Sequence, residues 1–141
     1  MCSRVRLRGM KATPIVVLDG LRILVAEDEV LALMTLEDIL RDAGCDIVAT
    51  ISRVGPALEA ACEVEVDIAL LDVNLAGERV YPVAEVLAAR CVPFLFMTAY
   101  SREMLPTRYA TRPLVTKPFT PSELIDGISE ALANGERHAS A

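Results

Sequence analysis

Short apolar runs alternate with segments of helical periodicity along most of this chain, and this alternation constrains the fold more than any other feature. Each run is short enough for a buried strand, and each intervening segment repeats apolar residues at helical spacing. Because strand and helix alternate five times, the sequence predicts an α/β fold with a doubly wound, five-stranded parallel sheet and right-handed crossovers. The predicted strands are 21–26, 45–50, 67–72, 93–98 and 113–116.

The composition indicates one domain with an aliphatic core. Of the 141 residues, 53% are hydrophobic and only 4% aromatic, yet no apolar run approaches the roughly 18 residues of a membrane-spanning helix. The apolar residues must therefore be buried within the protein itself. The net charge of −6 opposes nonspecific binding to nucleic acid, which requires a basic surface. We expect neither a nucleic-acid partner nor a membrane.

The folded domain is expected over residues 21–136, with a flexible tail at 1–20 and a short C-terminal tail at 137–141. No long apolar stretch follows the N-terminal arginines, which argues against a secretory signal. The cysteines show no CxxC pairing, and His138 is the only histidine, so we expect small, reduced core residues in a cytoplasmic protein. These cysteines are Cys2, Cys45, Cys62 and Cys91.

The first and last helices have clear boundary signals. The first is expected to stop at Gly44. The last is expected to begin with a capping box of Thr120 and Glu123 and to end at Asn134 and Gly135. The inward residues expected of the first helix are Val30, Leu33, Met34, Leu36, Ile39 and Leu40.

The remaining helical segments carry weaker patterns. The segment 54–64 is expected to turn Ala61 and Cys62 inward, together with Leu58, and a further helix is expected over 79–90. Prolines interrupt the segment 100–113, so a helix there is expected to be short or poorly formed.

Polar residues follow the predicted strands where the strands end. Glu27 and Asp28 follow the first strand, Asp72 ends the third, Thr98 ends the fourth and Lys117 follows the fifth. The carboxyl ends of parallel strands share one edge of the sheet, which is where ligands bind in such folds. Three carboxylates brought together there would repel one another. We expect Mg²⁺, which prefers oxygen ligands, and the Lys117 ammonium to offset that repulsion.

This set of groups suits phosphoryl transfer. We expect Asp72 to be the nucleophile, Asp28 a metal ligand, Glu27 an outer or water-mediated ligand, and Thr98 a hydroxyl donor to the phosphoryl group. Each residue alone has an ordinary structural explanation, such as a loop end, a helix cap or a surface charge. The hypothesis rests on the joint pattern, and Glu29 is left as a surface residue.

Four motifs in this order resemble the receiver domain of two-component response regulators over residues 21–135. They are "AEDE", "LLDVNLAGE", "PFLFMTAY" and "VTKPF". The resemblance implies a flavodoxin-like fold with strand order 2-1-3-4-5. It implies an aspartyl-phosphate at Asp72, formed from the phosphohistidine of a histidine kinase or a histidine phosphotransferase. It also implies a Mg²⁺ ligand in the backbone carbonyl of Asn74, and a cis bond between Lys117 and Pro118.

The motif "PFLFMTAY" is similar to the PFxFxTGY signature of the FAT GUY receivers, which are served by HWE-type or related kinases and are often stand-alone regulators. Ala99 stands where that signature has glycine, and Leu114 stands where most receivers carry a switch aromatic. The usual switch therefore does not transfer to this chain. We expect Thr98, Ala99 and Tyr100 to form the switch instead.

The predicted function is a stand-alone response regulator that signals by phosphorylation-dependent binding of an output protein. An alternative is a phosphate sink or shuttle in a phosphorelay. An aspartyl-phosphate phosphatase of the haloacid-dehalogenase type is disfavoured, because Asn74 stands where that class has a second Asp. A phosphorylation-independent scaffold is disfavoured by the completeness of the site. Under the first two hypotheses the chain is not an enzyme beyond its own phosphorylation and dephosphorylation.

Overall fold

A computed structural model describes residues 18–100 and 102–140, except for the side chains of 136–140. Residues 1–17 of the tail expected at 1–20, including Cys2, lie outside the described residues, as does the side chain of His138. The elements in chain order are β1 (Arg22–Ala26), α1 (Val30–Asp42), β2 (Asp46–Ile51), α2 (Val54–Glu63), β3 (Ile68–Asp72), β4 (Asn74–Leu75), β5 (Glu78–Arg79), α3 (Tyr81–Ala89), β6 (Phe94–Thr98), the 3₁₀ turns η1 (Arg102–Met104) and η2 (Thr107–Tyr109), β7 (Leu114–Thr116) and α4 (Pro121–Ser140).

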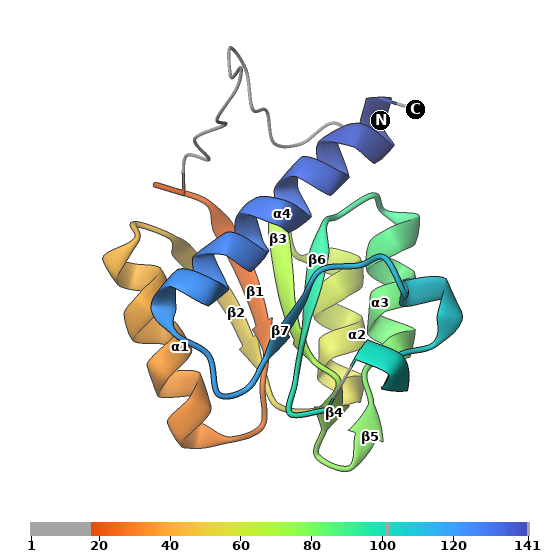
Figure 1. Cartoon of the computed structure of the whole chain (residues 1–141), viewed down its shortest axis with the longest axis horizontal. Coiled ribbons are helices and arrows are strands. Elements are labelled where there is room, and N and C mark those ends of the chain that lie inside the picture. Colours follow the sequence, from red (N-terminus) through yellow and green to blue (C-terminus); the bar gives the residue numbers. More distant parts are fainter. Residues whose placement is uncertain (1–17, 101, 141) are drawn as a thin grey trace.

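Five parallel strands form the central sheet in the order β2-β1-β3-β6-β7 (Figure 1). This order confirms the predicted 2-1-3-4-5 arrangement, with β6 and β7 as the fourth and fifth strands. All residues of the central strand β3 are buried, as its apolar sequence requires when helices cover both faces. Asp72, the last residue of β3, therefore occupies the middle of the carboxyl edge.

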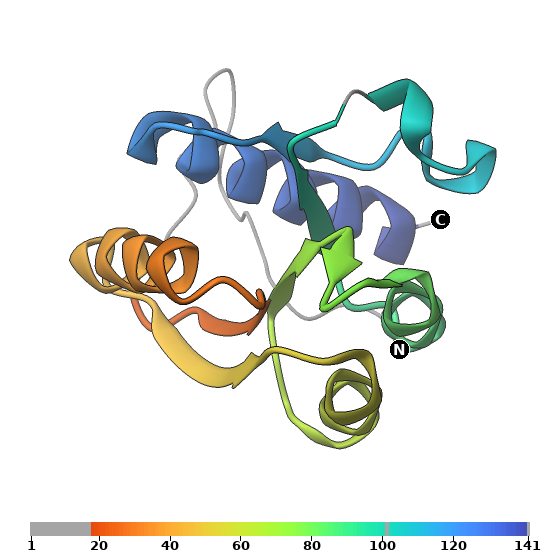
Figure 2. The same ribbon diagram turned by 90° about the horizontal axis from the view of Figure 1, so that it is seen from below.

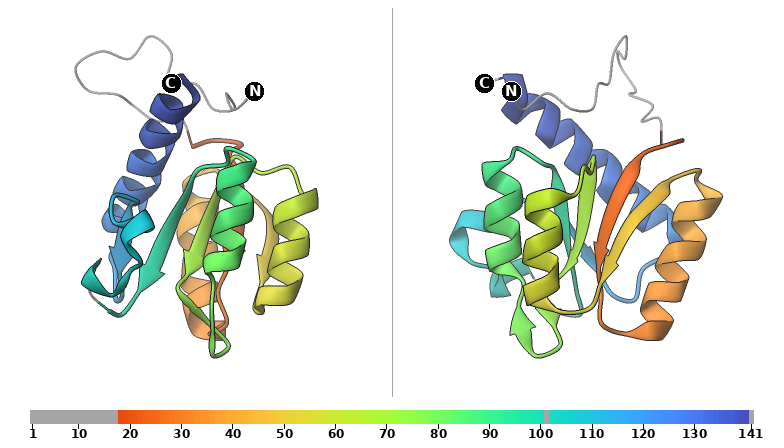
Figure 3. Two further views of the ribbon diagram at one scale, coloured as in Figure 1. Left: turned by 90° about the vertical axis from the view of Figure 1, so that its right-hand side faces the viewer. Right: turned by 180° about the vertical axis from the view of Figure 1, so that it is seen from behind.

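Helices cover the two faces of the sheet in pairs. Figure 2 shows α1 and α4 on one side and α2 and α3 on the other, and Figure 3 shows the same layers from two more directions. Each pair encloses its own hydrophobic core against one face of the sheet. The β4–β5 hairpin, which was not predicted, projects from the carboxyl edge beside β3 (Figure 3).

Helix α1 ends as predicted, but its expected inward face is partly wrong. Gly44 has a φ of +85°, the left-handed conformation in which glycine is favoured after a helix. Leu36 and Leu40 are buried, whereas the side chains of Val30 and Met34 remain exposed, at 70% and 53%. Both exposed residues lie in the first part of α1, at the carboxyl edge of the sheet, so spacing along the helix did not reveal where the sheet stops.

Helix α4 begins as predicted and ends later than predicted. The capping box is present: Thr120 N donates to Glu123 Oε1 at 2.8 Å, and Glu123 N donates to Thr120 Oγ1 at 3.1 Å. The helix runs through Asn134 and Gly135 to Ser140, so the expected stop is wrong. A Cβ at Gly135 would lie 2.6 Å from Pro93 Cγ, so this glycine permits close packing rather than ending the helix.

In the described residues between β6 and β7, which leave out residue 101, the helical structure is limited to the 3₁₀ turns η1 and η2. This confirms that a regular helix is not formed between these strands. Pro106 precedes η2 and separates it from η1, consistent with its missing N–H donor.

The cysteines differ from the expectation of reduced core residues. Cys45 is buried and free, as expected, but Cys62 is exposed, because Ala57, Ala60 and Ala61 provide the buried face of α2 instead. Cys91 follows α3 with a φ of +60°, is half-buried and is disulfide-bonded. Within the described ranges, no helix combines the length and the apolarity needed to cross a bilayer.

Candidate functional site

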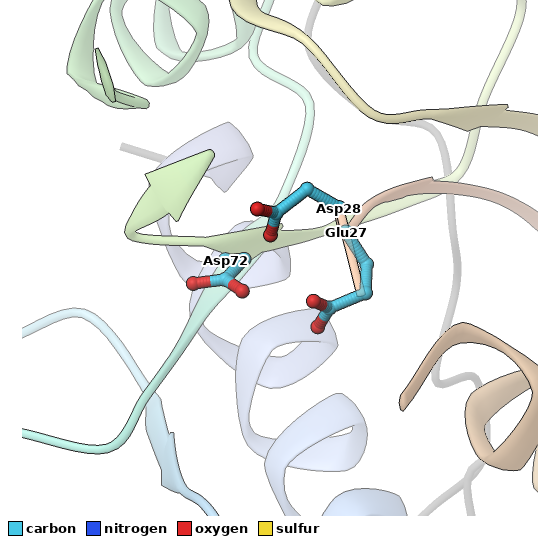
Figure 4. Close-up of side chains that lie close together, drawn as sticks. All are labelled: Glu27, Asp28 and Asp72. Atoms are coloured by element: carbon cyan, nitrogen blue, oxygen red, sulfur yellow. The ribbon is translucent and has the colours of Figure 1, made fainter. Parts of the chain in front are cut away.

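The polar residues that follow the strands meet at the carboxyl edge of the sheet. Strand β3 pairs with β1 on one side and with β6 on the other, which brings the ends of these strands together. Figure 4 shows the carboxylates of Glu27, Asp28 and Asp72 turned toward one another. One oxygen from each lies within 4.8 Å of the others, with Glu27 and Asp72 buried and Asp28 exposed.

Lys117 joins two of these carboxylates. Its Nζ donates to Asp72 Oδ2 at 2.7 Å and to Glu27 Oε1 at 2.8 Å. The Lys117 side chain is only 17% exposed, so these charge-assisted hydrogen bonds are largely shielded from water. Its backbone N donates to Thr98 O at 2.8 Å, which fixes the end of β7 beside the end of β6. The peptide bond between Lys117 and Pro118 is cis, as the sequence resemblance implied.

Burial and charge act in opposite directions on the ionisable groups here. Burial raises the pKa of Glu27 above the usual glutamate value and the Asp72 charge adds to the rise, although hydrogen bonds from Lys117 and from Glu29 N oppose it. Burial lowers the pKa of Lys117, but its hydrogen bonds to Asp72 and Glu27 outweigh burial and the net shift is upward. Glu27 is thus the carboxyl of the cluster whose pKa lies above its usual value.

Backbone amides of the β4–β5 hairpin hold the two aspartates. Asn74 N donates to Asp72 Oδ1 at 3.1 Å, and Ala76 N donates to Asp28 Oδ2 at 3.1 Å. Ala76 and Gly77 both have positive φ values, 52° and 87°, which are typical of a tight two-residue hairpin turn. The glycine of the Ala-Gly pair is the sequence signal that could have indicated this turn. The signal is weak, because alanine rarely adopts a left-handed conformation.

Thr98 and Tyr100 lie at the end of β6. Thr98 is buried, and its Oγ1 accepts a hydrogen bond from Tyr100 N at 3.0 Å, which leaves the hydroxyl proton available for another acceptor. Tyr100 is 55% exposed and lines, with Thr98, a cavity of about 210 Å³. The structure thus places the predicted switch residues Thr98, Ala99 and Tyr100 together beside β3 and β7.

Glu29 is the residue of this site that sequence reasoning treated as surface only. Its carboxylate is exposed, but Oε1 lies 3.8 Å from Lys117 Nζ, and its backbone N donates to Glu27 Oε2 at 3.1 Å. The donor set formed by Glu27, Asp28 and Asp72 consists of carboxylate oxygens alone. Such a set fits a hard divalent cation such as Mg²⁺ and does not suit a soft metal.

Comparison with known proteins identifies the family. The sequence profile described as the Response regulator receiver domain matches residues 23–129, which include every residue of this site. The chain belongs to the response regulator receiver family. The strand order and the position of the carboxylates agree with that membership.

Individual relatives cover most of this receiver. SdrG from Sphingomonas melonis Fr1 is 43% identical, with a TM-score of 0.69 over 82% of this chain and 96% of that one. The anti-anti-sigma factor PhyR from Bartonella quintana is 26% identical, with a TM-score of 0.71 over 86% of this chain and 51% of that one. The transcriptional regulatory protein PdtaR of Mycobacterium tuberculosis is 31% identical over 116 residues. That match covers 79% of this chain and 57% of PdtaR, so this chain spans little more than half of its curated relative.

The bonds of Lys117 predict a specific pattern of stability in metal-free protein. Replacing Lys117 by Met should lower the free energy of unfolding at pH 7 by about 1–3 kcal/mol, because the buried Glu27 carboxylate loses its cation. The raised pKa of Glu27 means that its charge opposes folding as pH rises. The deficit should therefore shrink as pH falls toward about 4.3, the ordinary glutamate value.

Urea unfolding of four proteins measures this effect: the wild type, Lys117→Met, Glu27→Gln and the double variant. Glu27→Gln removes the charge that Lys117 balances, so the double variant should recover much of the loss caused by Lys117→Met alone. If the loss of unfolding free energy in the double variant equals the sum of the losses in the two single variants, the bond between the side chains has no energetic consequence.

Proposed function

We propose that this receiver is a cytoplasmic phosphorylation switch that accepts a phosphoryl group on Asp72 from a histidine kinase or a histidine phosphotransferase. The observation that carries the proposal is the placement of Lys117 Nζ 2.7 Å from Asp72 Oδ2, inside a cluster of three carboxylates. A nucleophilic carboxylate needs a positive charge nearby that can follow the phosphoryl oxygens as they gain negative charge. The compact Lys117 ammonium on its flexible stem meets this need.

The proposed reaction transfers phosphorus from nitrogen to oxygen. A carboxylate oxygen of Asp72 forms a bond to phosphorus while the bond between phosphorus and the donor imidazole nitrogen breaks. The electron pair of the broken bond stays on the imidazole nitrogen. Lys117 donates to one phosphoryl oxygen, and the Thr98 hydroxyl donates to a second one. The Thr98 oxygen accepts from Tyr100 N, so the hydroxyl proton is available for this bond.

Mg²⁺ is the proposed cofactor, held by Asp28 and Asp72, with Glu27 as an outer or water-mediated ligand and the Asn74 carbonyl as a further ligand. When bound, it supplies positive charge that offsets the charge of the carboxylates and of the phosphoryl oxygens. Asp28 suits first contact with the ion because it is exposed, whereas Glu27 is buried and already bonded to Lys117.

The proposed protein partner contacts α1. Leu31 and Met34, 78% and 53% exposed, lie with Val30 near the start of this helix. A groove of about 390 Å³ adjoins them, lined by Glu29, Ala32, Thr35, Ala99, Lys117, Pro118 and Phe119. Exposed apolar side chains beside a groove that reaches Lys117 suit a helical donor that delivers a phosphohistidine. The similarity of "PFLFMTAY" to the FAT GUY signature supports an HWE-type or related kinase.

The proposed output is binding of a protein partner in a phosphorylation-dependent manner. PhyR, a structural relative, is an anti-anti-sigma factor, and this supports regulation through protein contacts rather than through DNA. A phosphate sink would use the same site without such a partner. Affinity capture with and without beryllofluoride, a phosphoryl mimic, distinguishes the two: an output protein binds one form better, whereas a sink shows no difference.

Phosphorylation of Asp72 is the first test. Incubation with acetyl phosphate and Mg²⁺ should add one phosphoryl group to the wild type, measured by intact mass. Asp72→Asn should abolish the addition, whereas Asp46→Asn, an exposed aspartate at the start of β2, should leave it unchanged. Undiminished phosphorylation of Asp72→Asn would assign the acceptor to another residue.

Metal binding is tested by thermal unfolding with increasing Mg²⁺. The wild type should gain about 2.7 kcal/mol when Mg²⁺ exceeds its dissociation constant a hundredfold. Asp28→Asn retains an oxygen that can accept from Ala76 N but loses the charge, so it should lose most of this gain. Glu29→Gln removes a charge from an exposed neighbour and serves as the matched control. Equal gains in both variants would refute the ligand role of Asp28.

The α1 surface is tested by phosphotransfer from purified, ATP-phosphorylated histidine kinases of the source organism. With the preferred kinase, the double change of Leu31 and Met34 to Ser should slow transfer at least tenfold, because apolar contact with the donor is lost. Cys62→Ser changes an exposed residue on α2, which covers the face of the sheet opposite to α1, and should have little effect. All three proteins should react alike with acetyl phosphate; a loss there as well would indicate damage to the site itself.

A further inference from the structure

Tyr109 attaches the segment between β6 and β7 to the body of the domain. In the described part of residues 101–112, only Leu105 and Tyr109 are buried. The Tyr109 ring stacks on Tyr81 at a centroid distance of 5.6 Å and meets Phe96 edge-on at 5.2 Å. A second edge contact joins it to Phe94 at 6.1 Å. The position of this segment therefore depends on where the Tyr109 ring sits.

The same rings lie next to the phosphorylation site. Tyr81 stacks on Tyr109 and also lines the cavity of about 210 Å³ that Thr98 lines. Phe96, two residues before Thr98 on β6, contacts both Tyr81 and Tyr109. Thr98 and Tyr81 both line this cavity. Because the cavity is unfilled, both side chains can move without disrupting the packed core.

The neighbouring strand contributes no aromatic ring to this cluster. Leu114 of β7 is in register with Phe96 and packs, half-buried, against the core that contains Tyr109. The rings next to β6 come instead from α3 and from η2. The chain has only three tyrosines, and the third, Tyr100, is 55% exposed, while Tyr109 is 4% exposed.

Besides Tyr109, the buried Leu105 side chain packs into the same core, and the Arg112 guanidinium lies 4.3 Å from the centroid of the Phe94 ring. Several polar contacts of the segment are exposed or long. Arg108 pairs with Glu85 at 3.1 Å on the surface, and Arg102 Nη1 donates to the Ala110 and Arg112 carbonyls within the segment itself. The Tyr109 hydroxyl donates to Tyr81 O at 3.5 Å, at the upper limit for a hydrogen bond. Surface ion pairs and long hydrogen bonds restrain weakly, so packing by the buried side chains of Tyr109 and Leu105 dominates, and Tyr109 is the one stacked on Tyr81.

We propose that Tyr109 couples phosphorylation of Asp72 to the segment 102–112, in the role that the sequence assigned to Tyr100. This inference rests on the proposed function. When the Thr98 hydroxyl donates to the phosphoryl group, its side chain shifts toward Asp72 and the cavity beside it changes shape. Tyr81 and the stacked Tyr109 move with the cavity wall, and Tyr109 carries η1 and η2 with it. Tyr109 acts through other side chains and is a positioning residue.

Nuclear magnetic resonance of protein with ¹³C-labelled tyrosine rings tests this directly, because Tyr81, Tyr100 and Tyr109 are the only tyrosines. Beryllofluoride with Mg²⁺ serves as the phosphoryl mimic, and its ¹⁹F signal reports whether it is bound. On binding, the ring signals of both Tyr81 and Tyr109 should shift in the wild type. A shift of Tyr100 alone, with Tyr109 unchanged, would overturn the inference and leave Tyr100 as the switch.

Amide hydrogen exchange of residues 102–112 provides the second readout. Beryllofluoride should change wild-type exchange rates there at least fivefold. Tyr109→Phe keeps the ring and should retain the change, whereas Tyr109→Leu should reduce it to less than twofold while the ¹⁹F signal of the bound mimic persists. Tyr100→Leu is the matched control and should behave as the wild type.

The possible failures are distinct. If the mimic binds but Tyr109→Leu and Tyr109→Phe both retain the full change in exchange, Tyr109 is not the coupling residue and the proposed function still stands. If no bound mimic is detected in wild-type protein and acetyl phosphate adds no phosphoryl group, the proposed function fails, and this inference fails with it.

Discussion

The two short hydrogen bonds from Lys117, to Asp72 and to Glu27, are the interaction on which the arrangement of the site depends. They place a cation between carboxylates on neighbouring strands, at the end of a sheet whose central strand is completely buried. One ammonium does not balance three carboxylates, so the cluster retains net negative charge, and the charge of Asp72 adds to the rise that burial causes in the pKa of Glu27. The same imbalance makes the edge receptive to a divalent cation and then to a phosphoryl group.

The sheet was predictable because its signals are local and repeat along the chain. Each strand is a compact apolar run, and the alternation with helices predicts the doubly wound parallel sheet, while the order of strands came from the family resemblance. Features that depend on contacts across the fold were not predictable in this way. The exposure of Val30 and Met34 depends on where the sheet stops, and the role of Gly135 depends on Pro93, 42 positions away in the printed sequence. A glycine that permits close packing and a glycine that ends a helix look alike in sequence.

The principal residues of the site were predictable because the ends of parallel strands converge, whatever the loops do. Residues that reach the site through backbone geometry were harder to find. The amide of Ala76 donates to Asp28 because the hairpin turn holds Ala76 in a left-handed conformation. An alanine in the sequence does not indicate that conformation. Tyr109 was missed for a different reason: it lies in a segment with no regular periodicity, so its burial against Tyr81 depends entirely on tertiary packing.

The site and the segment 102–112 are built with different degrees of restraint, and this difference suits a switch. Glu27, Asp72 and Thr98 are buried at the ends of strands, where ladder hydrogen bonds and a packed core fix them. In place of a helix, the segment has two short 3₁₀ turns and two buried side chains, those of Leu105 and Tyr109, and the backbone hydrogen bonds of its turns stay within the segment. Under the proposed coupling, a small shift of Thr98 does not deform the sheet but moves a segment held mainly by two buried side chains. Short 3₁₀ turns in the described residues of this segment therefore lie next to Thr98, which agrees with the proposal that a phosphoryl group on Asp72 acts on the segment through Thr98.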